Sequence, residues 1–126
     1  MKKLLSTIVL AITCVAALAQ KSKVWDDVIT GYCNIPVINI TKVTFTPDST
    51  EVCMRLSFRA GKQFGFTSGT HLKVGTQQYA VKNATVIKLN EGYTMPTDTV
   101  DFSLIFNPAP LGTTRMDLIE PAGITF

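Results

Sequence analysis

The sequence predicts an all-β fold: a single antiparallel β-sandwich (immunoglobulin-like) or a small barrel, with about seven or eight short strands. Threonine and valine are abundant, and short alternations of apolar and polar residues are separated by turn residues at intervals of about ten. No segment keeps an apolar period of 3.6 residues, as an amphipathic helix would. With 126 residues, 46% hydrophobic and 17% charged, the chain is expected to form one folded domain.

The N-terminus has the three parts of a secretory signal peptide. Lys2-Lys3 is a short basic region, Leu4 to Val15 is an apolar run, and Ala17-Leu18-Ala19 is a small-x-small cleavage site. The apolar run is shorter than the roughly 20 residues that a transmembrane helix needs. We therefore expect residues 1–19 to be a signal peptide and residues 20–126 to be the β-sandwich domain. Lipidation at Cys14 is the alternative, although Thr13 is bulky for that processing site.

Export changes what the composition implies. Loss of Lys2 and Lys3 lowers the formal net charge from +3 to +1, and no basic run remains for nucleic-acid binding. The mature chain contains no candidate transmembrane span. The protein is therefore expected to be exported.

The first strands form a predicted antiparallel hairpin. Val37 to Thr46 alternates, Pro47 to Thr50 contains turn residues, and Glu51 to Phe58 is the clearest half-buried strand. An uninterrupted alternation in the first strand places these residues together on one face: Val37, Asn39, Thr41, Val43 and Phe45.

The rest of the domain is expected to contain further short strands. A glycine-rich segment contains a loop or edge strand around Phe64-Gly65-Phe66, and the region most open to a short helix is Val24 to Ile29. The other expected strands are His71 to Val74 paired with Gln77 to Val81, then Thr85 to Leu89, Val100 to Phe106, Met116 to Ile119 and Ile124 to Phe126.

Two cysteines remain after removal of the signal peptide. In an exported protein, Cys33 and Cys53 are able to form a disulfide, which would stabilise the fold by roughly 3 kcal/mol. Two free thiols are equally compatible with the sequence, because Cys53 lies in a strand where a free cysteine packs as a small hydrophobic residue. The two residues do not form a Cys-x-x-Cys site.

No residue pattern predicts a reaction. His71 is the single histidine and has no marked nucleophile, while Asp26-Asp27 would point to opposite faces of a strand. We therefore expect no enzyme activity, no cofactor and no metal site. The predicted partner contacts are exposed aromatic side chains: Trp25, Phe64, Phe66 and Tyr93.

The C-terminal half resembles a known domain. The resemblance is carried by these segments: Tyr79-Ala80-Val81, Ile87-Lys88-Leu89, Met95-Pro96, Asp101 to Leu111, and Met116 to Glu120. Two earlier segments also fit its opening strands: Ile40 to Val43 and Thr50 to Val52. The series resembles the N-terminal β-domain that precedes the thioredoxin-like domain in Gram-negative envelope thiol-disulfide oxidoreductases. The thioredoxin half, with its Trp-Cys-x-x-Cys site, is missing from this sequence.

The resemblance implies an accessory β-domain without catalytic residues, located in the bacterial periplasm or cell envelope. We expect an exported, non-catalytic interaction module whose partner is a thioredoxin-like or other envelope protein. The alternative is an independent ligand-binding or adhesive surface domain, which the aromatic residues near the glycine-rich loop would favour.

Overall fold

The computed structural model describes residues 22–31 and 35–123, and these residues form nine β-strands and no helix. The strands are β1 (Lys23–Trp25), β2 (Ile38–Phe45), β3 (Thr50–Ser57), β4 (Gln63–Phe64), β5 (His71–Val74), β6 (Gln77–Thr85), β7 (Tyr93–Thr94), β8 (Thr99–Phe106) and β9 (Asp117–Ile119). The predicted all-β class is confirmed.

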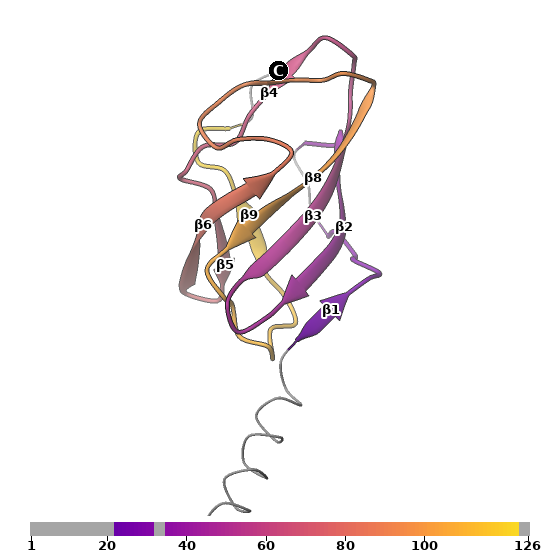
Figure 1. The fold of residues 1–126 in the computed structure, drawn as a ribbon. Helices are drawn as coiled ribbons and strands as arrows, with labels where there is room; N and C mark the ends of the chain where they lie inside the picture. Colours follow the sequence, from indigo (N-terminus) through magenta and orange to yellow (C-terminus); the bar gives the residue numbers. More distant parts are fainter. Residues whose placement is uncertain (1–21, 32–34, 124–126) are drawn as a thin grey trace, which may run out of the picture.

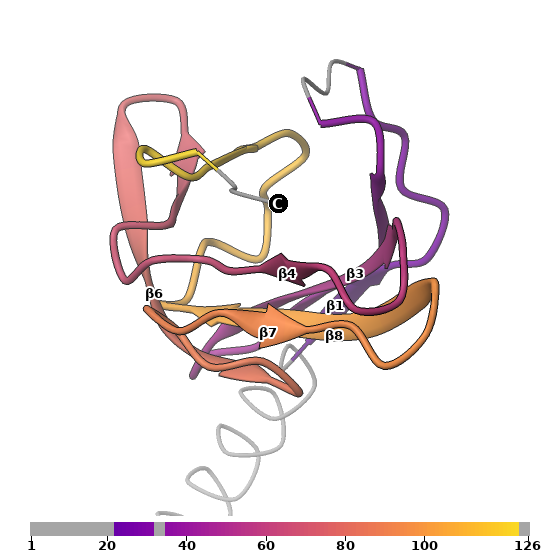
Figure 2. The ribbon, with the colours of Figure 1, turned by 90° about the horizontal axis from the view of Figure 1, so that it is seen from above.

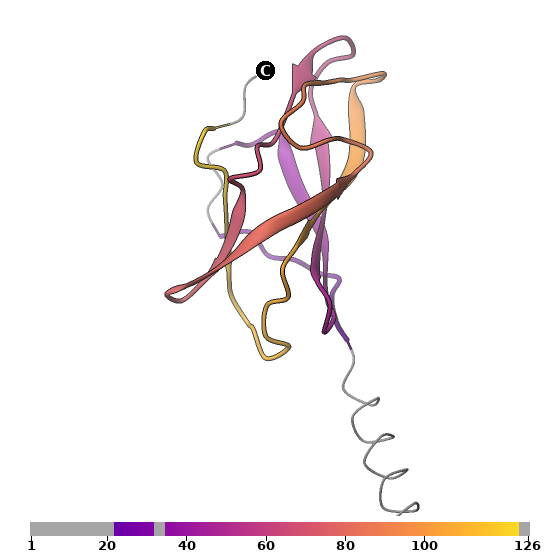
Figure 3. The ribbon, with the colours of Figure 1, turned by 60° about the vertical axis from the view of Figure 1, so that its left-hand side comes forward.

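Seven strands form one antiparallel sheet in the order β1-β2-β3-β8-β6-β5-β9, and β4 pairs with β7 in a small second sheet. Figure 1 shows β2, β3 and β8 side by side. In Figure 3, β6 is turned away from their direction, so the large sheet is curled. Figure 2 shows β4 and β7 next to each other across the end of that sheet. This arrangement is consistent with a sandwich or a half-barrel.

The core lies on the inner side of the curl. Alternate residues of β3 (Val52, Met54 and Leu56) and of β8 point inward, as the period of two in a strand requires. Phe64 and Phe66 add aromatic rings from the loop around β4, and both rings lie against Phe102 of β8.

The predicted first hairpin is confirmed. The prediction of which side chains share a face of its first strand is wrong for one half of that strand. The register between β2 and β3 shifts between Ile40 and Lys42, so β2 contains a β-bulge. The extra residue reverses which side chains point inward. Ile38 and Ile40 are half-buried before the bulge, whereas Val43 and Phe45 are buried after it.

One region open to a helix and one expected strand differ from the structure. Lys23–Trp25 pairs with β2 as an edge strand, and residues 26–31 contain bends, so no helix forms between Val24 and Ile29. The strand expected at Thr85 to Leu89 ends at Thr85, because Val86 has a φ of 69° and the Ile87 N–H donates to the Thr85 carbonyl. The strand expected at Ile124 to Phe126 lies outside the described residues.

Candidate functional site

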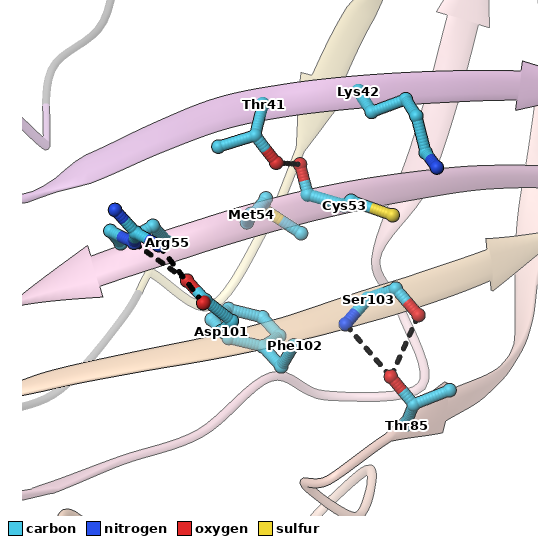
Figure 4. A pocket seen from close by; sticks show the side chains of 9 residues that line it. All are labelled: Thr41, Lys42, Cys53, Met54, Arg55, Thr85, Asp101, Phe102 and Ser103. Carbon is cyan, nitrogen blue, oxygen red and sulfur yellow. Dashed lines mark hydrogen bonds and ion pairs between the residues drawn. The ribbon is translucent and has the colours of Figure 1, made fainter. Parts of the chain in front are cut away.

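One candidate region is a shallow depression on the outer face of the large sheet. It has a volume of about 470 Å³ and takes its residues from four neighbouring strands (Figure 4). These residues define the outer-face depression: Thr41, Lys42, Cys53, Met54, Arg55, Thr85, Asp101, Phe102 and Ser103. The strand register places Lys42, Cys53, Ser103 and Thr85 in one row across the sheet.

The hydroxyl group of Ser103 is the centre of a hydrogen-bond network in this row. Ser103 Oγ donates to Glu51 Oε2 at 2.9 Å and lies 2.7 Å from Thr85 Oγ1. Thr85 Oγ1 also accepts a hydrogen bond from the Ser103 N–H at 3.0 Å. Ser103 is only 4% exposed, so its neighbours shield the hydroxyl from solvent.

An ion pair lies at the other end of the depression. Arg55 Nε donates to Asp101 Oδ1 at 2.7 Å and Arg55 Nη2 donates to Asp101 Oδ2 at 3.1 Å, so the contact is bidentate. The hydrogen bond from Arg55 lowers the pKa of the Asp101 carboxyl, and the hydrogen bond to Asp101 raises the pKa of the Arg55 guanidinium. Both side chains are more than half exposed, at 54% and 66%.

Cys53 is a free, half-buried cysteine between these two groups. Burial raises the pKa of its thiol, and the negative charge of Glu51 raises it further, while Lys42 lowers it. The thiol is therefore protonated at neutral pH, which is the less nucleophilic form. Cys33, the other half of the predicted disulfide, lies outside the described residues.

The second candidate region is a pocket of about 430 Å³ where three loops meet beside β4 and β7. We call it the loop pocket. It is lined by residues 63–67, 90–92 and 122–123, namely Gln63, Phe64, Gly65, Phe66, Thr67, Asn90, Glu91, Gly92, Ala122 and Gly123.

Close backbone approach holds two of these loops together. A Cβ atom at Gly65 would lie 2.9 Å from the Glu91 carbonyl oxygen, so only glycine fits there without a shift. Asn90 has a φ of 65°, its N–H donates to the Phe66 carbonyl at 2.8 Å, and its Oδ1 accepts the Ser68 N–H at 2.8 Å. The wall formed by these loops is therefore fixed by several independent contacts.

Glu120 fastens the third loop to the first. Its Oε1 accepts hydrogen bonds from Thr67 Oγ1 at 2.7 Å and from the Thr67 N–H at 3.4 Å. Its Oε2 accepts a hydrogen bond from Thr70 Oγ1. The carboxylate thus joins the segment after β9 to the glycine-rich loop.

The predicted exposure of Phe64 and Phe66 is wrong. Both are 1% exposed, because their rings pack into the core against Phe102. A partner therefore cannot reach these rings in this structure. Trp25 is half-buried with its ring 4.8 Å from that of Phe45, and Tyr93 is half-buried against Phe64. Their role as partner contacts stays a prediction, and the two are not neighbours in the sheet pairing.

Sequence reasoning missed the residues that the structure brings together. The contact between Ser103 and Thr85 could not be predicted, because the two residues are distant in the sequence and their pairing depends on the β6–β8 register. Asn90 and Glu91 were assigned no role from the sequence. The Asn-Glu-Gly triplet was the available signal, since asparagine and glycine mark backbone conformations that other residues avoid.

Residues 22–31 and 35–123 contain no group of three or more histidine, cysteine, aspartate or glutamate residues able to hold a metal ion. Within the same ranges, no helix is long and apolar enough to cross a membrane. Comparison of the chain with models of protein families, with curated proteins and with solved structures finds no match.

Proposed function

We propose that the chain is an exported, non-catalytic interaction module of the bacterial cell envelope, and that it binds a thioredoxin-like or other envelope protein. The signal-peptide pattern supports the location, and the resemblance to the β-domain of envelope oxidoreductases supports the class of partner. The outer-face depression is the surface that we assign to this contact.

The bidentate Arg55–Asp101 pair beside the half-buried Cys53 carries this assignment. The pair fixes two charged side chains in a defined geometry on the face of a sheet. A surface whose side chains are already ordered loses less conformational entropy when a partner binds. Arginine also keeps donors free for a second acceptor after it has bound one carboxylate.

The side chains in the depression are better suited to binding than to catalysis. The Cys53 thiol has a raised pKa, and the Ser103 hydroxyl is hydrogen-bonded and shielded. A thiol nucleophile needs a lowered pKa. A serine nucleophile must be open to a substrate, and Ser103 is only 4% exposed.

The test is capture from an envelope extract by the full chain, expressed with its own N-terminus and a C-terminal tag. We expect recovery of a protein with a thioredoxin-like domain. The double variant Arg55→Ala/Asp101→Ala should lose most of the capture, whereas Lys73→Ala, an exposed residue on β5, should retain it. Equal capture by the double variant would reject the assignment to this face. Turnover of a disulfide substrate by the reduced protein at thioredoxin-like rates would reject the non-catalytic role.

A further inference from the structure

We propose that the loop pocket binds a neutral saccharide of one or two rings. The pocket lies beside β4 and β7, and its residues are distinct from those of the outer-face depression. Its volume of about 430 Å³ is within the usual range for small-molecule sites, which begins at roughly 300 Å³. This inference does not depend on the function proposed above.

Two exposed side chains at the pocket carry hydrogen-bonding atoms without a partner in the described residues. Asn90 uses its Oδ1 to accept the Ser68 N–H, and its amide nitrogen has no partner in residues 22–31 and 35–123. The Glu91 carboxylate likewise has no partner within these ranges. Asn90 and Glu91 are adjacent in the sequence and both line the pocket. Together they offer an amide donor and a carboxylate acceptor, which match a sugar hydroxyl because it both donates and accepts hydrogen bonds.

The charges around the pocket favour a ligand without negative charge. Glu91 is the single charged residue among the lining residues, and the Glu120 carboxylate lies behind the wall at Thr67. Neither carboxylate makes an ion pair within residues 22–31 and 35–123, and two such carboxylates repel phosphate and carboxylate groups. One exposed carboxylate is also too few for a calcium site, because Ca²⁺ usually binds about 6–8 oxygen ligands.

Contacts within the protein fix the walls of the pocket in the absence of a ligand. The close contact between Gly65 and the Glu91 carbonyl, together with the two hydrogen bonds made by Asn90, fixes the backbone that presents both side chains. Glu120 fixes Thr67 on the opposite loop. Preorganisation of this kind reduces the entropic cost of binding, which matters most for a small polar ligand.

The inference is tested by isothermal titration calorimetry with glucose, galactose, mannose, N-acetylglucosamine, maltose and lactose. We expect at least one of these sugars to bind with a dissociation constant on the order of 1 mM. Inorganic phosphate and acetate should not bind.

The variant Asn90→Asp isolates the amide donor. Aspartate keeps an oxygen for the Ser68 N–H and tolerates the positive φ, so the loop should fold as before. We expect the affinity for the sugar to fall about tenfold. This is roughly the effect of losing one hydrogen bond between the amide and the ligand. An unchanged thermal unfolding midpoint would show that the fold is retained.

The variant Glu91→Gln isolates the carboxylate, and Asp117→Asn is its control. Asp117 is an exposed residue on β9 outside the pocket, and its substitution changes the net charge by the same amount. We expect Glu91→Gln to weaken binding and Asp117→Asn to leave it unchanged. Asn90→Asp and Glu91→Gln change the net charge in opposite directions, so a loss in both shows hydrogen bonding rather than general electrostatics.

Three results would overturn the proposal. One is the absence of heat from all six sugars, and another is sugar binding that neither Asn90→Asp nor Glu91→Gln weakens. The third is binding of phosphate or acetate in place of the sugars, which would show a different ligand class.

Discussion

The outer-face depression and the loop pocket have similar volumes, of about 470 and 430 Å³, but they use their polar groups differently. On the outer face, Arg55 pairs with Asp101, and Ser103 bonds to Glu51 and Thr85. In the loop pocket, the backbone and Glu120 make the structural contacts, and the Glu91 carboxylate has no partner in the described ranges. The first region is an ordered surface, and the second has hydrogen-bonding groups left for a ligand.

The difference arises from how strands and loops place side chains. On one face of a sheet, residues opposite each other on neighbouring strands lie close enough to pair, as Arg55 and Asp101 do in the β3–β8 register. Residues 65–67 and 90–92 lie outside the strands and meet through backbone contacts at Gly65 and Asn90, so their side chains have no cross-strand neighbour.

The largest loss of stability is expected from a substitution where the loop pocket joins the core. Phe66→Ala should lower the free energy of unfolding by about 3–5 kcal/mol, because it removes a ring that is 1% exposed and packs on Phe102. Urea denaturation measures the change. Tyr93→Ala, at a half-buried ring, should cost less. An equal loss in both variants would mean that the two rings contribute alike to the core.

A smaller loss of stability is expected when the backbone contact that shapes the pocket wall is disturbed. Gly65→Ala should cost about 1–3 kcal/mol, because the added methyl group would lie 2.9 Å from the Glu91 carbonyl oxygen. Gly112→Ala is the control, since nothing lies within 4 Å of its added Cβ. Thermal or urea unfolding of the two variants makes the comparison. Gly65→Ala with wild-type stability would show that the loops separate easily.

On the outer face, loss of the Ser103 hydroxyl should lower the free energy of unfolding by less than either substitution at the loop pocket. Ser103→Ala should lower the free energy of unfolding by about 1 kcal/mol, because Glu51 and Thr85 lose a hydrogen-bond partner. Ser57→Ala, an exposed position on β3, is the control and should leave stability unchanged. Equal urea midpoints for the two variants would show that water replaces the network without loss.

The smallest effect concerns the Arg55–Asp101 pair and is measured by how stability changes between neutral and acid pH. Arg55 lowers the pKa of the folded-state Asp101 carboxyl, so the pair stabilises the fold above the carboxyl pKa of the unfolded chain. That contribution is lost as the pH falls through the lowered pKa. Asp101→Asn should therefore make stability less dependent on pH in the acid range, by an amount close to the limit of measurement, because both side chains are exposed. Urea midpoints measured from neutral to acid pH test this, and a steeper acid loss in Asp101→Asn would contradict it.

Much of the fold follows from local pattern. Alternation in Glu51 to Phe58 and in Val100 to Phe106 predicted β3 and β8, because each strand buries one face. The bulge in β2 was missed, since an unbroken alternation was assumed across Thr41. The signal was present, because that assumption placed Ile38 and Ile40 on the face opposite Val43.

The candidate sites were less predictable than the strands. Aromatic rings near a glycine-rich loop were expected to be exposed, but Phe64 of β4 and Phe66 of the following loop are buried in the core against Phe102. The contact of residues 65–67 with residues 90–92 joins segments about 25 residues apart, which a local pattern does not encode.

Nuclear magnetic resonance titration of the full chain with the six sugars tests the contrast between the two regions most directly. The account predicts that at least one sugar shifts the backbone amide signals of residues 63–67, 90–92 and 122–123. The amides of Cys53 and Ser103 on the outer face should not move. Shifts centred on the outer-face depression, or no shifts at the loop pocket with any of the sugars, would contradict the account.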